Sequence, residues 1–184
     1  MKRTPFPALA RLLPLSVALA ACTPLASWAQ STPDRAPPAA QMDLARTTLV
    51  LDGKKLGVQI ARSERELAIG LMSRISMPAD EGMVFIFPQA ATQCFWMRNT
   101  LIPLSVAFID AQGRIINLAD MQPLSDDAHC SLKPAQFVLE ANQGWFKKNG
   151  IKAGIKIEGI KAAETPSKSA PAAPAQTAPR PASS

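Results

Sequence analysis

An apolar stretch of the chain is interrupted by a short polar segment that could contact a ligand. Residues 95–97 are Phe, Trp and Met, and residues 98–100 are Arg, Asn and Thr, before the sequence turns apolar again. In an extended strand Trp96 and Arg98 lie on the same face, where a guanidinium can stack on an indole with about 0.5–2 kcal/mol. Two interpretations stay open: a polar strand end that holds a bend at Asn99, or a ligand-contacting cluster of Trp96, Arg98 and Asn99.

Charged residues beside other apolar segments form a second candidate group. Glu140 ends an apolar run, and a buried or half-buried carboxylate there needs a partner, for which an arginine (Arg62, Arg74 or Arg98) is the natural choice. The group is either a structural ion pair or a polar pocket for an anionic or sugar-like ligand. Asp110 and Glu140 would serve as an acid/base pair in an enzyme acting on a carbohydrate or cell-wall component, provided that they face each other.

Other catalytic and metal-binding patterns are absent or incomplete. The chain has one histidine, His129, and no G-x-S-x-G, P-loop or G-x-G-x-x-G sequence. Residues 126–130 carry two Asp, a His and a Cys, but no second cluster follows at structural-zinc spacing. We therefore expect neither a metal nor a cofactor, and we regard an enzyme as less favoured than a binding protein.

The N-terminal residues have the pattern of an export signal. A positively charged start precedes an apolar run from Leu12 to Ala21, which is too short to span a bilayer. Two processing sites compete: cleavage after Ala29, which would make residues 1–29 a signal peptide, or lipidation at Cys22 after removal of residues 1–21. Both predict export to the periplasm or to an envelope surface, and membrane attachment follows only from lipidation.

Composition divides the remainder into three parts. Residues 30–42 and 162–184 are rich in Pro, Ala and other small residues, which predicts a disordered linker and a disordered tail around a single domain at 43–161. Between residues 43 and 160 there are thirteen Lys and Arg against twelve Asp and Glu. This near balance argues against a nucleic-acid partner, which would favour clustered basic residues. The expected partner is instead a small molecule or a cell-envelope component of unknown identity.

Two cysteines remain within the predicted domain. In an oxidising compartment Cys94 and Cys130 are candidates for a disulfide, which would stabilise the fold by roughly 3–4 kcal/mol in the chain-entropy model. The alternative is two buried free thiols.

The domain is predicted to be mainly β, a sandwich or barrel of about seven short strands with one or two short helices. Asp52-Gly53 between two alternating segments predicts a hairpin, and Ser63 with Glu66 predicts a capping box at the start of a short helix. Further strands are expected near 82–88, at 94–98, 102–109, 114–117 and 136–140, and as a last strand at 155–160, with helical turns at 143–148.

The order of several short motifs resembles domain-of-unknown-function family number 192. The motifs are GLMSR at 70–74, GMVF at 82–85, FWMRNT at 95–100, IPL at 102–104, FID at 108–110, VLE at 138–140 and GI at 150–151. The resemblance implies a mainly-β, often exported domain and supplies no catalytic residues. Ser105 stands where the family usually has Asp, Ile155 follows Gly154 where it often has Asp, and Arg98 replaces its usual Lys.

Taken together, these patterns favour an exported, non-catalytic binding or accessory module. Its ligand would meet Trp96, Arg98 and Asn99, with Arg74, Asp110 and Glu140 as further contacts.

Overall fold

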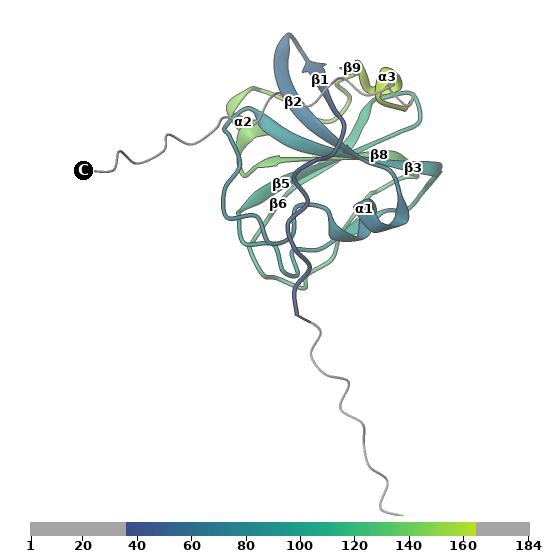
Figure 1. Ribbon diagram of the computed structural model, residues 1–184. Helices are drawn as coiled ribbons and strands as arrows, with labels where there is room; N and C mark the ends of the chain where they lie inside the picture. Colours follow the sequence, from purple (N-terminus) through teal and green to yellow (C-terminus); the bar gives the residue numbers. More distant parts are fainter. Residues whose placement is uncertain (1–35, 165–184) are drawn as a thin grey trace, which may run out of the picture. The chain divides into compact units, whose positions relative to one another are not determined.

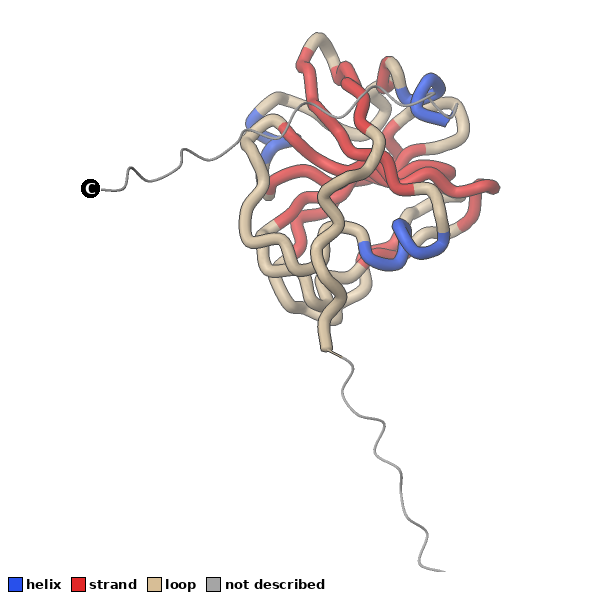
Figure 2. The backbone as a smooth tube through the Cα atoms, in the orientation of Figure 1, coloured by secondary structure: helices blue, strands red, loops and turns tan. Residues whose placement is uncertain are grey.

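The computed structural model describes residues 36–164, which form one curled sheet with short helices on both faces (Figure 1, Figure 2). The sheet has seven strands in the order β6-β5-β8-β3-β2-β1-β9. Their bounds are β1 (Arg46–Leu51), β2 (Lys54–Ala61), β3 (Glu81–Ala91), β5 (Leu104–Ile109), β6 (Ile115–Met121), β8 (Ala135–Asn142) and β9 (Ile157–Glu158). A separate two-stranded sheet pairs β4 (Cys94–Phe95) with β7 (His129–Cys130). The predicted mainly-β class is confirmed, in the form of a half-barrel.

Local sequence signals fix the first half of the fold. Strands β1 and β2 pair antiparallel across Asp52-Gly53, as the turn dipeptide predicts. Helix α1 (Glu64–Ile69) begins with the predicted capping box, in which Ser63 accepts from the Glu66 N–H and the Glu66 carboxylate accepts from the Ser63 N–H. This helix connects β2 to β3, which run parallel, whereas β3, β8, β5 and β6 pair antiparallel in turn.

Alternating side chains divide the core between the two faces of the sheet. One cluster packs under α2 (Trp145–Lys148) and α3 (Ile160–Glu164) and includes Val84 and Leu139. The other lies on the face that α1 covers and includes Phe85 and Val138. Neighbouring residues of β3 and β8 therefore point to opposite clusters, so both faces of these central strands are covered.

The structure differs from the prediction in two segments. The strand expected from Cys94 to Arg98 is only two residues long, because the chain leaves the sheet at Trp96, and the bend expected at Asn99 is a turn at residues 98–99. The last strand, expected at 155–160, is limited to Ile157–Glu158, and Ile160 instead begins α3, a third helix. Ile160 and Ala163 are buried on this helix, so their apolar pattern is helical rather than alternating.

The predicted linker and tail are described only in part. Residues 1–35 and 165–184, which include Cys22 and Ala29, lie outside the described residues. From the linker, the Gln41 side chain donates to the carbonyls of Glu66 and Gly70, and the Pro38 carbonyl accepts from Ser73 Oγ. Across 36–164 the structure contains no helix of the length and apolarity that crossing a bilayer requires.

Candidate functional site

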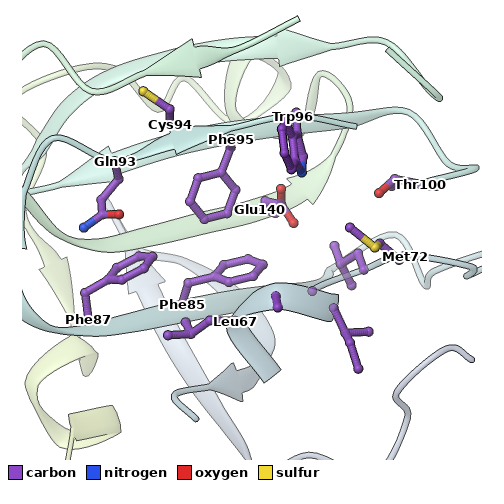
Figure 3. Close-up of a pocket in the computed structure, with 14 residues that line it drawn as sticks. Leu67, Met72, Phe85, Phe87, Gln93, Cys94, Phe95, Trp96, Thr100 and Glu140 are labelled. Carbon is purple, nitrogen blue, oxygen red and sulfur yellow. The ribbon is translucent and has the colours of Figure 1, made fainter. Parts of the chain in front are cut away.

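A pocket of about 310 Å³ opens on the face of the sheet that α1 covers. Residues 67–72, from α1 and the loop after it, form one wall together with Phe85 and Phe87 of β3. Residues 93–96, around β4, form the opposite wall (Figure 3). Thr100 and Glu140 complete the lining, and Figure 3 shows the Glu140 carboxyl group between the two walls.

The β4 wall is held by loops rather than by the main sheet. Cys94 and Cys130 are directly opposite each other in the β4–β7 ladder and form a disulfide. The backbone N–H of Gln93 donates to Ser131 Oγ, and the Ser131 N–H donates back to the Gln93 carbonyl. The Asn117 side chain, on β6, donates to the Cys130 carbonyl. The disulfide therefore fixes the wall that carries the aromatic side chains next to it.

Loss of the disulfide is expected to destabilise the domain and to loosen the pocket. In the double variant Cys94→Ala, Cys130→Ala, the free energy of unfolding should fall by roughly 3–4 kcal/mol, since the crosslink closes a loop of 36 residues. Urea unfolding of the oxidised protein and of the double variant measures this difference. Equal midpoints would show that the crosslink contributes nothing to stability.

Trp96 and Arg98 stack at the mouth of the pocket. The Arg98 guanidinium carbon lies 4.4 Å from the centroid of the Trp96 ring, as the sequence predicts, although the two residues follow β4 rather than belong to it. Trp96 is 49% exposed. Arg98 Nε donates to Asp126 Oδ1 at 2.8 Å, and this hydrogen bond raises the pKa of the guanidinium. Asn99 has a φ of 58°, the left-handed conformation of a tight turn.

Glu140 is a buried carboxyl group that lies next to the pocket. On β8 it pairs with Met83 of β3 and Val106 of β5, so its side chain projects into the core face beneath α1. The residue is 4% exposed, and no hydrogen bond from residues 36–164 reaches its carboxyl oxygens. Burial raises its pKa to about 8, against a smaller lowering by the charge of Arg74.

The direct ion pair expected between Glu140 and an arginine is not formed. Arg74 is also buried, but its Nη2 donates to the Gln41 carbonyl and to Gln59 Oε1, and its Nε has no partner among the described residues. Desolvation lowers the pKa of Arg74. Gln59 on β2 pairs with Met83 on β3, which in turn pairs with Glu140 on β8. Through its hydrogen bond to Gln59, Arg74 therefore lies on the same face of the sheet as Glu140 but two strands away from it. It does not line the pocket.

The predicted candidates are brought together only in part. Trp96 and Glu140 line the same pocket, and Arg98 stacks on Trp96 at its mouth. Asp110 lies elsewhere: its carboxylate accepts from the backbone N–H groups of Gln112 and Arg114, in the turn between β5 and β6. Because Glu140 pairs with Val106, Asp110 is four residues further along the chain, about 13 Å away. The condition for an acid/base pair, that Asp110 and Glu140 face each other, is therefore not met.

Sequence reasoning missed most of the pocket wall. Phe85 and Phe87 lie in an apolar strand that is typical of a core, and Phe95 has no polar neighbour to single it out. The available signal was the irregular apolar pattern of α1, whose Leu67 is only partly buried and lines the pocket. Within residues 36–164, no three His, Cys, Asp or Glu side chains are grouped so that they could hold a metal ion.

The structure is similar to two solved bacterial proteins. One, from Sinorhizobium meliloti 1021, is described as a proposed transcription regulator; it is 31% identical, with a TM-score of 0.61, over 65% of this chain and 97% of that one. The other, a protein of unknown function from Novosphingobium aromaticivorans DSM 12444, is 33% identical, with a TM-score of 0.60, over 67% of this chain and 94% of that one. A search of curated proteins found no match.

The family model described as "Uncharacterized ACR" matches residues 47–159, which is most of the domain and includes the whole pocket wall. The motifs from GLMSR to GI fall within this match. The chain therefore belongs to domain-of-unknown-function family 192, as the order of its motifs predicts.

Proposed function

We propose that this protein is a non-catalytic binding module whose pocket takes a small, largely apolar ligand with one polar group. The observation that supports this most is the buried Glu140, which lines the pocket and lacks a hydrogen-bonding partner among the described residues. An unpaired buried carboxyl group costs stability, and such groups occur mainly where a protein uses them. A ligand that pairs with it would offset this cost.

The remaining lining explains why the ligand would be mostly apolar. Phe85, Phe87, Phe95 and Trp96 supply aromatic surface, and Leu67 and Met72 supply aliphatic and thioether surface. Sites for small molecules commonly combine such walls with a few polar groups that fix orientation. Here those polar groups are Glu140, Thr100 and Gln93.

The geometry gives less support to a carbohydrate-cleaving enzyme. Both mechanisms of glycoside hydrolysis usually need two carboxyl groups on either side of the scissile bond. Glu140 is the one carboxyl group among the described lining residues, and Asp110 is bound within its own turn. Binding therefore accounts for the site with fewer assumptions than catalysis does.

We also propose that the protein is exported and acts outside the cytoplasm. The charged and apolar pattern of residues 1–29 supports it, as does the Cys94–Cys130 disulfide, since such crosslinks persist in oxidising compartments. Native mass spectrometry of the protein purified from its own cells tests it. A mature N-terminus at Gln30 or a lipidated Cys22 supports export, whereas an intact Met1 with free thiols contradicts it.

Replacing Trp96 is expected to remove ligand binding without unfolding the domain. Trp96 is half-exposed at the pocket mouth, so Trp96→Ala removes a contact surface but creates no core cavity. A small-molecule library is screened by ligand-observed NMR against both proteins, and hits on the parent should be lost or weakened at least about tenfold in the variant.

A matched control is Leu132→Ala, which removes an exposed apolar side chain that does not line the pocket. This variant should bind as the parent does. Loss of the folded amide spectrum in Trp96→Ala, with Leu132→Ala still folded, would show that Trp96 is structural and would overturn the proposed site.

A further inference from the structure

We propose that the polar group of the ligand is a small organic cation, an alkylammonium, held between the Glu140 carboxylate and the aromatic walls. This inference rests on the proposed binding function and adds the chemical class of the ligand. It uses two features that arise from separate strands: a buried carboxyl group on β8, and aromatic rings carried by β3 and by the segment around β4.

The aromatic rings supply the first feature. Phe95 packs edge-to-face against Phe85, with ring centroids 4.8 Å apart, and its centroid lies 6.4 Å from that of Phe87. Trp96 follows Phe95 directly and lines the same pocket as Glu140 (Figure 3). The faces of such rings carry negative potential and attract ammonium groups, most strongly where water is excluded. The Arg98 guanidinium 4.4 Å from Trp96 shows a cation already stacked on this indole.

The carboxyl group of Glu140, which accepts no hydrogen bond from the described cations, supplies the second feature. The charged groups near it are Arg74, from the loop after α1, and beyond it Arg46 of β1 and Glu81 of β3. Arg46 is paired with Glu81, and Arg74 donates to Gln41 and Gln59 rather than to Glu140. Arg98 is paired with Asp126. The described cations therefore leave the carboxyl oxygens of Glu140 open to the pocket.

Binding of the cation is coupled to the release of a proton. Burial keeps Glu140 protonated below a pKa of about 8 in the empty pocket. A cationic ligand stabilises the carboxylate, so the carboxyl proton passes to solvent as the ligand enters and the net charge of the site is unchanged. Affinity should therefore rise with pH up to about 8 and become constant above it.

Choline and its neutral isostere 3,3-dimethylbutan-1-ol test this inference, since they differ in the charged nitrogen and hardly in shape. Both are titrated into the full mature protein by calorimetry at about pH 7, below the pKa of the empty site, in two buffers with different ionisation heats. Choline should bind at least about 30-fold more tightly than the isostere, the discrimination of a desolvated cation–π contact, and should release close to one proton. The isostere should release none.

Glu140→Gln provides the matched variant, because it keeps the size of the side chain and removes the titration. It should bind choline more weakly than the parent does and release no proton, because the aromatic walls remain and the carboxylate is gone. Equal affinity of the parent for choline and the isostere would overturn the cation inference and leave the binding function standing. If the library screen finds ligands whose binding depends on Trp96 but choline does not bind at millimolar concentration, the cation inference is wrong and the proposed binding function still holds. If neither the library nor the two probes bind, both proposals fail.

Discussion

Replacing Gly82 with Ala is expected to destabilise the domain severely. Gly82 lies on β3 opposite Ala141 of β8, where a Cβ atom would stand 2.2 Å from the backbone carbonyl oxygen of Glu140. That oxygen belongs to the backbone of a central strand, so relief of the clash requires β3 and β8 to separate. We expect the free energy of unfolding to fall by at least about 4 kcal/mol, which exceeds half the stability of many domains. Circular dichroism and urea unfolding measure the loss.

A second strand glycine makes a matched control for this variant. On Gly57, in β2, an added Cβ atom would have the Asp80 carbonyl oxygen as its nearest neighbour at 3.7 Å, which is an ordinary contact distance. Gly57→Ala should therefore be neutral or stabilising, because alanine restricts the unfolded chain. If Gly82→Ala unfolds at the same urea concentration as Gly57→Ala, the close approach of β3 and β8 is wrong.

The parts of the fold that follow from local sequence were predictable. Asp52-Gly53 specifies a turn and Ser63 with Glu66 specifies a helix start, and both signals act over a few residues. The segment after Cys94 was predicted wrongly because its conformation depends on distant partners. Ser125, whose carbonyl accepts from the Met97 N–H, lies far along the chain, as does Cys130. A local sequence pattern does not show that a strand ends where hydrogen bonds to distant loop residues replace hydrogen bonds to a neighbouring strand.

The same distinction applies to the candidate site. Trp96 and Glu140 were predictable because each is a polar or amphipathic residue in apolar surroundings, where its presence needs a reason. Asp110 attracted attention on the same grounds, but its carboxylate is used by the turn that it begins. Phe85 and Phe87 could not be distinguished from core residues, because sequence alone does not show that part of an aromatic surface is left uncovered.

The stability of the empty protein is expected to fall as the pH rises, and Glu140 is the cause. In the unfolded chain this carboxyl group loses its proton near pH 4.5, whereas burial raises its folded pKa to about 8. Between these values the folded state holds one more proton than the unfolded state. The free energy of unfolding therefore decreases with pH by about 1.4 kcal/mol per unit, roughly 5 kcal/mol in total, and levels out above a pH of about 8.

Glu140→Gln should remove this dependence, since the amide keeps the shape and does not ionise. Urea unfolding of both proteins is measured from about pH 4 to about pH 9, and the difference between them isolates Glu140 from all other titrating groups. The variant should be similar to the parent at the acid end and clearly more stable at a pH of about 8. Glu158→Gln, at an exposed glutamate on β9, serves as the control and should follow the parent throughout.

A parent and a Glu140→Gln variant with parallel profiles would show that the carboxyl group has a partner that offsets its burial. The expected divergence would instead mean that the empty domain tolerates a large stability cost near neutral pH. A cationic ligand would reduce that cost, because it pairs with the carboxylate that burial disfavours. Stabilisation of the parent by choline should therefore rise with pH and reach its full value at a pH of about 8, above which the empty site is already ionised. In the variant it should be smaller and independent of the Glu140 titration.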